Sequence, residues 1–120
     1  MPTITQTERE LVPSGTSVTH SSHTSGTLSL VGTWGGHGVA RVKNGGTGPG
    51  AGCHFKLYQD FDGIDRRLIS DQAAGVLADA IYDFPFVVPV GVQKIVAWFG
   101  DHTNQPVNVD CYLDEITSIT

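Results

Sequence analysis

The five histidines are the side chains best suited to hold a metal ion, but their spacing does not suit metal binding. They lie at positions 20, 23, 37, 54 and 102. His20 and His23 are close in sequence but have no carboxylate or third ligand nearby, and a zinc site needs at least three protein ligands. His54 has the outward phase of its strand, which indicates a surface residue, and His102 falls in a turn. We therefore expect no metal site among the histidines.

One group of carboxylates resembles the beginning of a calcium-binding loop. Its residues are Asp60, Asp62, Gly63 and Asp65. An EF-hand loop also needs a closing glutamate at its twelfth position, and position 71 is an aspartate in a strand-and-turn context. A hairpin turn whose carboxylates face water explains the same residues, because Asp-Gly is a strong turn signal. We favour the turn, and we expect no metal ion and no cofactor.

No residue shows the local pattern of an activated nucleophile, since the sequence has no Gly-x-Ser-x-Gly motif. Cys53 and Cys111 are 58 positions apart (111 − 53) and both have the inward phase of their strands. We expect reduced, buried and unreactive thiols, with a disulfide across the core as the alternative. The glycine-rich segment 44–52 lacks the lysine and the following helix of a phosphate-binding loop, and we expect a mobile loop there.

Carboxylate pairs and aromatic side chains leave two further activities to consider. Asp114 and Glu115 are the only adjacent acidic pair, and glycosidase chemistry needs two carboxylates brought together in space, which a sequence does not locate. Trp34, Tyr58 and Trp98 could line a sugar platform, although Trp98 lies in an apolar strand and is expected in the core. We expect no catalytic residues and no enzyme activity, and we keep carbohydrate binding as an alternative.

The composition indicates one domain built of strands. The chain has 120 residues, of which 39% are apolar, 16% are charged and 15 are glycine, a balance that favours strands and turns over helices. The net charge of −5 gives no electrostatic basis for binding nucleic acid and disfavours an anionic membrane surface. The N-terminus lacks a basic region followed by an apolar run, so we expect no signal peptide and synthesis in a cytoplasm.

Two segments near the C-terminus have the clearest strand patterns. Residues 92–100 contain a run that is apolar on both faces, as in a central strand. Residues 107–113 alternate between apolar and polar side chains, as in a strand with one wet face. Because only the polar turn 101–106 separates them, the two segments predict a β-hairpin. The residues expected in the core, with two from an upstream strand, are Phe55, Leu57, Ile95, Ala97, Phe99, Val107, Val109, Cys111 and Leu113.

The upstream sequence predicts five more short strands separated by turn signals, at residues 27–34, 39–43, 53–58, 64–70 and 80–88. Pro85 indicates a sheet edge, a bulge or a strand end, because proline has no N–H to donate. Residues 71–79 are expected to form a loop or a short strand. About seven strands of this kind predict an all-β fold, a single antiparallel β-sandwich of the jelly-roll or Ig-like type.

Residues 1–26 differ from the rest in being rich in Ser, Thr and Gly, with isolated apolar residues. We expect them to form an extended N-terminal arm that is ordered where it lies on a partner, and residues 27–120 to form the sandwich domain. A disordered leader, or one ordinary strand of the sandwich, would account for the same composition. The residues of the arm expected to contact a partner are Ile4, Leu11, Val12 and Val18.

The C-terminal half carries a pattern that resembles small virion proteins of tailed bacteriophages. The matching residues are 84–100 and 106–119, and the upstream segment 43–49 with the Asp62-Gly63 turn is also similar. The resemblance covers residues 27–120 and consists of β-sandwich patterning rather than of chemical signatures.

The resemblance implies a structural virion protein without catalysis, made in the host cytoplasm. The kind of virion protein that the resemblance implies first is a capsid decoration (cement) protein, which binds the outer surface of the head and bridges capsid subunits. The implied partners are the major capsid protein or another virion protein, and further copies of the chain in a homo-oligomer, for which a trimer would fit a capsid axis. The alternatives are a tail or head-fibre component that contacts the host surface, and a small carbohydrate-binding module that would expose Trp34 and Tyr58.

Overall fold

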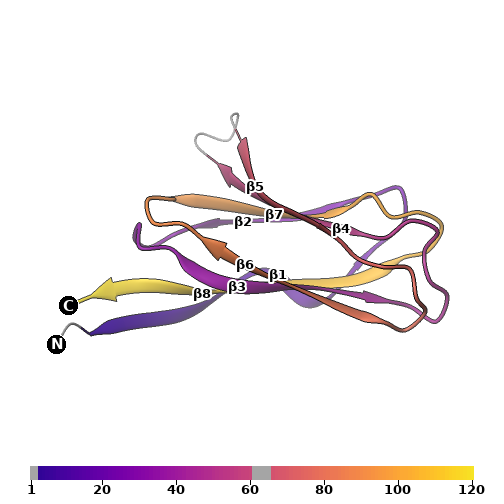
Figure 1. Ribbon diagram of the computed structural model, residues 1–120, viewed down its shortest axis with the longest axis horizontal. Helices are drawn as coiled ribbons and strands as arrows, with labels where there is room; N and C mark the ends of the chain where they lie inside the picture. The colour runs from indigo at the N-terminus through magenta and orange to yellow at the C-terminus, as the bar shows by residue number, and fades with distance from the viewer. Residues whose placement is uncertain (1–2, 61–65) are drawn as a thin grey trace.

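The computed structural model describes residues 3–60 and 66–120, which form two antiparallel sheets packed face to face, as Figure 1 shows. Each sheet has four strands, in the orders β1-β8-β3-β6 and β2-β7-β4-β5. The strands are β1 (Ile4–Val18), β2 (Thr24–Ser29), β3 (Gly36–Asn44), β4 (His54–Asp60), β5 (Arg66–Ala73), β6 (Ile81–Val88), β7 (Lys94–Gly100) and β8 (Val107–Ile119). The prediction of a single antiparallel β-sandwich is confirmed.

The turn expected at Asp62-Gly63, and most of the group that resembles a calcium-binding loop, fall on residues 61–65, outside the described part of the chain. Asp60 is described and is buried at the end of β4, with Oδ2 3.9 Å from Lys94 Nζ. Among the described residues, no helix has the length and hydropathy needed to cross a membrane.

β7 and β8 lie where the sequence predicts two strands, but they do not form the predicted hairpin. β7 pairs with β2 and β4, whereas β8 pairs with β1 and β3, so the two strands belong to different sheets. The hairpin prediction was wrong because alternation shows which side chains face inward and not which strand lies alongside. Residues 101–106 arch from one sheet to the other, with Asp101 and Asn104 at φ of 65° and 73°.

The core lies between the two sheets and contains all nine residues expected there, each at most 2% exposed. Phenylalanine rings join the two layers. The ring centroid of Phe55 on β4 lies 5.3 Å from that of Phe99 on β7, and 5.5 Å and 6.4 Å from those of Phe86 and Phe84 on β6. Pro85 lies between these last two residues, on the edge strand of its sheet, as its missing N–H indicated.

Residues 4–18 are a strand of the sandwich and not a separate arm. β1 pairs with β8 along most of its length, and Leu11, Val12 and Val18 are buried in the core. β2 (Thr24–Ser29) also crosses the boundary expected after residue 26. The alternation of β1 was hard to recognise because its register shifts twice between residues 10 and 16, so that the successive residues Leu11 and Val12 are both buried.

Part of the glycine-rich segment 44–52, which was expected to be a mobile loop from its composition, approaches neighbouring backbone closely. A Cβ added at Gly48 would lie 1.8 Å from the carbonyl oxygen of Val76, and one added at Gly52 would lie 1.8 Å from that of Ala74. Glycine is needed at these two positions because the backbones approach more closely than a side chain allows.

We expect Gly52→Ala to lower the melting temperature, whereas Gly46→Ala should leave it nearly unchanged. A Cβ at position 52 would overlap the Ala74 carbonyl, while nothing lies within 4 Å of a Cβ at position 46. Forcing extra atoms into a packed contact costs about 1–3 kcal/mol. For a domain of this size, each kcal/mol lost lowers the melting temperature by about 4 °C. Thermal unfolding followed by circular dichroism measures both variants, and equal melting temperatures would contradict the close approach.

Candidate functional site

The histidines lie on separate elements and do not converge. His54 Nδ1 lies 2.9 Å from Asp71 Oδ1, and His37 Nε2 lies 3.7 Å from Asp114 Oδ2. Both contacts are pairwise and open to solvent. In residues 3–60 and 66–120, no group of three or more His, Cys, Asp or Glu side chains is arranged to hold a metal ion.

His102, which was expected in the turn after residue 100, is buried in the arch between β7 and β8. Its side chain is almost completely enclosed, and Nε2 donates a hydrogen bond to the carbonyl oxygen of Val18 at 3.0 Å. Within the described part of the chain, Nδ1 has no hydrogen-bond partner. The imidazole therefore joins the arch to the end of β1, and its role is structural.

The two cysteines are free thiols buried in the core. Burial raises the pKa of Cys53 to about 12, and burial likewise raises the pKa of Cys111 to about 12. Because the thiolate is the nucleophilic form of cysteine, thiols with such raised pKa values are unreactive near neutral pH. Neither cysteine is therefore suited to catalysis, and the alternative of a disulfide across the core is not formed.

Trp98 lies on the outer face of the second sheet, and not in the core as expected. Its indole lies close over Gly100, where an added Cβ would be 2.7 Å from the ring. His23 stacks on the indole at a centroid distance of 5.7 Å, and Lys56 Nζ lies 4.8 Å from the ring centroid in a cation–π contact. The indole is thus engaged by the protein's own side chains and offers no free platform to a sugar ring.

Trp34 and Tyr58, which would be the evidence for a sugar platform, come from different parts of the fold. Tyr58 is half-buried on β4, in register with Val96 of β7 and Leu68 of β5. Trp34 lies in the segment between β2 and β3, where its ring packs against Gly32. Trp34 belongs to a loop and Tyr58 to a strand of the second sheet, and among the described residues the two rings make no ring contact with each other.

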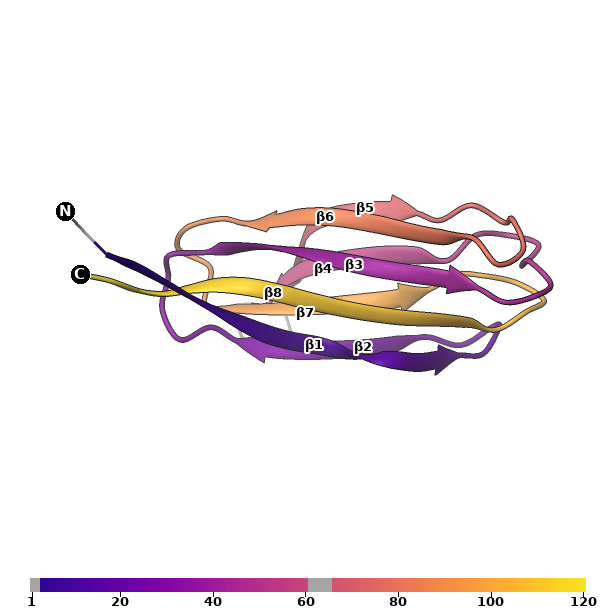
Figure 2. The ribbon, with the colours of Figure 1, turned by 90° about the horizontal axis from the view of Figure 1, so that it is seen from below.

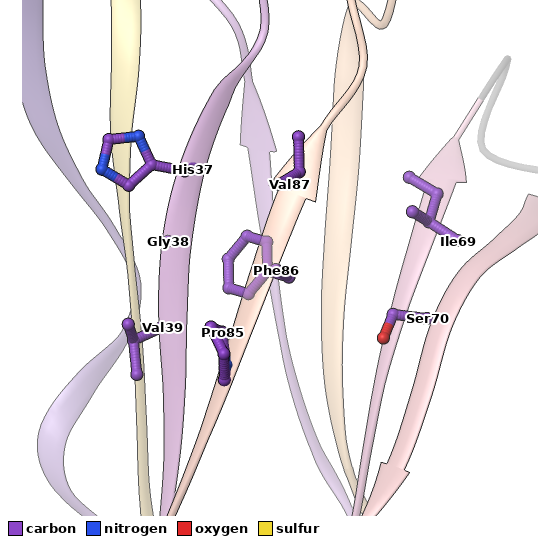
Figure 3. Close-up of a pocket in the computed structure, with 8 residues that line it drawn as sticks. All are labelled: His37, Gly38, Val39, Ile69, Ser70, Pro85, Phe86 and Val87. Atoms are coloured by element: carbon purple, nitrogen blue, oxygen red, sulfur yellow. The ribbon is translucent and has the colours of Figure 1, made fainter.

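An open hollow of about 470 Å³ lies at the side of the sandwich where the edge strands β5 and β6 face each other (Figure 3). Its walls are His37, Gly38 and Val39 of β3, Ile69 and Ser70 of β5, and Pro85, Phe86 and Val87 of β6. The lining contains one imidazole and one hydroxyl but no carboxylate or thiol. The hollow therefore supplies apolar surface rather than acid–base chemistry.

Three exposed apolar side chains lie on loops at the end of the sandwich from which both termini project, an end that can be followed in the ribbon of Figure 1. Two connecting segments meet there, residues 30–35 between β2 and β3 and residues 89–93 between β6 and β7. Gly91 N donates a hydrogen bond to the Thr33 carbonyl oxygen at 2.7 Å and joins them. We call this surface the apolar pole, and its residues are Val31, Trp34 and Val90, which are 68%, 38% and 77% exposed.

A buried ion pair fixes the base of the apolar pole. Glu115 of β8 is 1% exposed, and its Oε1 lies 2.5 Å from Nη1 of Arg9 on β1. Its Oε2 accepts hydrogen bonds from the backbone N–H groups of Val31 at 2.6 Å and Gly32 at 3.3 Å. Because hydrogen bonds to an ionised group are stronger than neutral ones, Glu115 holds the segment that carries Val31 firmly against β1 and β8.

Beyond Glu115, β1 and β8 continue as a two-stranded ribbon that extends past the body of the sandwich (Figure 2). Ile4 and Ile119 lie opposite each other near its tip, and both are exposed. Of the four residues expected to contact a partner, Ile4 is therefore the accessible one, whereas Leu11, Val12 and Val18 belong to the core.

Val31 and Val90 were not identified from the sequence as binding residues, whereas Trp34 was considered only as part of a sugar platform. Val31 fell within an expected strand, and Val90 fell within a bend that was given no role. The signal that could have identified them is an apolar residue placed between turn residues, since Gly32 follows Val31, and Pro89 and Gly91 flank Val90.

No protein-family model matches the chain, and no curated protein matches it in sequence. Among solved structures, the chain is similar to tripeptidyl peptidase 2, with a TM-score of 0.59 and 9% identity over 92% of this chain but 10% of that chain. It is similar to the K3 cleaved adhesin domain of Lys-gingipain from Porphyromonas gingivalis w83, with a TM-score of 0.54 and 12% identity over 92% and 74% of the two chains. A weaker similarity, with a TM-score of 0.46 and 8% identity over 98% and 88%, is to naturally occurring empty particles of cowpea mosaic virus. At these identities the first two similarities establish the β-sandwich fold alone.

Proposed function

We propose that the chain is a non-enzymatic structural protein of a bacteriophage virion, a capsid decoration protein that binds the outer surface of the head and bridges capsid subunits. The resemblance of residues 27–120 to small phage virion proteins supports this proposal. The observation that carries it is the apolar pole, in which Val31, Trp34 and Val90 are exposed together on segments held by Glu115.

The apolar pole suits attachment to another protein. Contiguous exposed apolar side chains mark interaction sites, and tryptophan is among the residues that contribute most binding energy at interfaces. The Glu115 contacts hold the backbone near Val31 before any partner arrives, so that docking orders little additional chain.

Attachment to a shell also lowers the affinity that each contact needs. A decoration protein occurs in many copies, and a bridging copy touches two subunits, so several weak contacts act together. A rigid sandwich with its attachment surface at one end can meet this requirement without a deep pocket.

We expect Val90→Asp to reduce binding to capsids at least ~10-fold, because losing the burial of one valine costs about 1.5 kcal/mol or more. The matched control is Leu77→Asp, because the Leu77 side chain is 69% exposed and that of Val90 is 77% exposed. Leu77 lies at the other end of the sandwich, where its carbonyl accepts a hydrogen bond from Asn44 at the end of β3. Co-sedimentation of each variant with capsids that lack the protein measures the occupancy.

Equal occupancy of the two variants would overturn the assignment of the apolar pole. Co-sedimentation with isolated tails instead of heads would replace decoration by the tail or head-fibre alternative. Binding to neither particle, together with retention on an immobilised polysaccharide, would replace it by carbohydrate binding.

A further inference from the structure

The ribbon formed by the ends of β1 and β8 has backbone groups that pair with no other strand of the described chain. Thr3 and Thr120 exchange two hydrogen bonds, of 2.5 Å and 2.9 Å. In an antiparallel ladder the next residue then directs its N–H and C=O away from the partner strand. Ile4 therefore presents its backbone donor and acceptor at the free edge of β1, which is the outermost strand of its sheet.

The composition of the ribbon favours pairing. Residues 3–7 and 116–120 consist of Thr, Ile, Ser and Gln, with no charge, no proline and no glycine. Residues that favour strands, on an exposed edge without charged or proline residues, form a template for another strand. A two-stranded ribbon with open faces is also only marginally stable in water, so an added strand stabilises it.

The opposite edge of the same sheet, β6, is protected. β6 carries Pro85 in its middle, and the Pro85 carbonyl oxygen accepts a hydrogen bond from Gln72 of β5 at 3.3 Å. Further along, β1 itself is interrupted by Pro13 and by register shifts. Proline and covering segments are among the devices by which sheets avoid unwanted pairing, and in the described chain the ribbon edge of β1 has neither. The ribbon contains a register shift between Thr5 and Gln6, but its extra residue, Thr117, lies on β8 and not on the free edge of β1.

We infer that the ribbon edge of β1 pairs with the same edge of a second copy of the chain, in antiparallel orientation. Each copy offers the same unpaired segment, so one two-fold contact satisfies both edges at once. The chain carries a net charge of −5, which opposes association elsewhere, whereas the paired segments 3–7 bring no charges together. The contact joins the two ribbons into a four-stranded sheet in the order β8-β1-β1-β8.

The contact buries a small area, because it involves about five residues from each chain. Interfaces well below about 1,000 Å² are weak or transient. The dimer is therefore expected to dissociate on dilution. On a shell covered with copies, the same contact links neighbours, where their high local concentration favours it.

Sedimentation equilibrium of the purified chain tests the pairing without any capsid, and so independently of the proposed function. The average mass should rise from that of one chain, 12.8 kDa, towards twice that value as the concentration increases from about 10 μM to about 1 mM. Ile4→Pro should raise the dissociation constant at least ~10-fold, because proline removes the outward N–H and leaves the bonds of Thr3 to β8 intact. The matched control is Val87→Pro, which makes the same change at an exposed position on the protected edge of β6, and it should leave dimerisation unchanged.

Circular dichroism melts of both variants confirm that they are folded before their masses are compared. A wild-type chain that remains a monomer at the highest concentration would overturn the inference, and so would an Ile4→Pro variant that dimerises as the wild type does. A third outcome would also overturn self-pairing. If the wild-type chain is a monomer but Ile4→Pro abolishes its binding to capsids, the edge of β1 pairs with a strand of the shell protein instead.

Discussion

A single aspartate at position 95, 109 or 111 is expected to leave the chain unfolded. Ile95, Val109 and Cys111 are at most 1% exposed and lie in the apolar cluster between the sheets. Burying an unpaired carboxylate costs several kcal/mol even after the structure relaxes. Since the whole domain is stabilised by about 5–15 kcal/mol, Ile95→Asp, Val109→Asp and Cys111→Asp should each remove most of that stability.

Far-UV circular dichroism and thermal melts of the three variants provide the measurement. The control is Val39→Asp, which places the same charge on the outer face of β3, where Val39 is exposed, and should melt cooperatively near the wild-type temperature. Soluble core variants with cooperative melts would show that these positions do not face the core.

Glu115→Ala is expected to cost about 3 kcal/mol of stability, although glutamate is a residue usually found at the surface. The substitution leaves Arg9 without its carboxylate and leaves the N–H groups of Val31 and Gly32 without an acceptor. Urea denaturation measures the loss as a lower midpoint at an unchanged slope.

The matched control for Glu115→Ala is Asp114→Ala. Asp114 is the adjacent carboxylate, but its side chain is half exposed and lies 3.7 Å from His37 in an open ion pair. Surface ion pairs of this kind contribute about 0–1 kcal/mol. A double-mutant cycle with Arg9→Ala separates the ion pair from the two backbone hydrogen bonds. If Glu115→Ala and Asp114→Ala unfold at the same urea concentration, Glu115 does not anchor the apolar pole.

Periodicity predicted the direction of side chains better than the pairing of strands. The alternation Val107, Val109, Cys111 and Leu113 identified the inward face of β8 correctly, because the pleat alone determines it. The same pattern is compatible with a hairpin and with an arch between sheets, and the choice depends on tertiary contacts such as that of buried His102 with Val18. Sheet membership was therefore not predictable from these two segments.

The outward position of Trp98 and the buried position of Leu11 show where periodicity fails. Val96 and Trp98 both lie on the outer face of β7, and two apolar residues on one face resemble a core pattern. Trp98 is instead covered by the side chains of His23 and Lys56, which come from other parts of the chain. In β1, register shifts bring Leu11 and Val12 inward together. Local bulges and long-range cover are not encoded in a short window of sequence.

The apolar pole could be predicted less well than the fold. Val31, Trp34 and Val90 come from two segments more than fifty positions apart, and the hydrogen bond between Gly91 and Thr33 that joins these segments follows from the packing of the two sheets. Residues 27–34 were expected to form a strand, which placed Val31 and Trp34 within it, and nothing in the sequence indicated that this segment would meet the one that carries Val90.

Cryo-electron microscopy of capsids saturated with the purified chain tests the central proposal most directly. We expect additional density on the outer surface of the head, at positions that bridge capsid subunits, with Val31, Trp34 and Val90 directed at the shell. Heads without added density, or copies bound with that end directed away from the shell, would contradict the proposal.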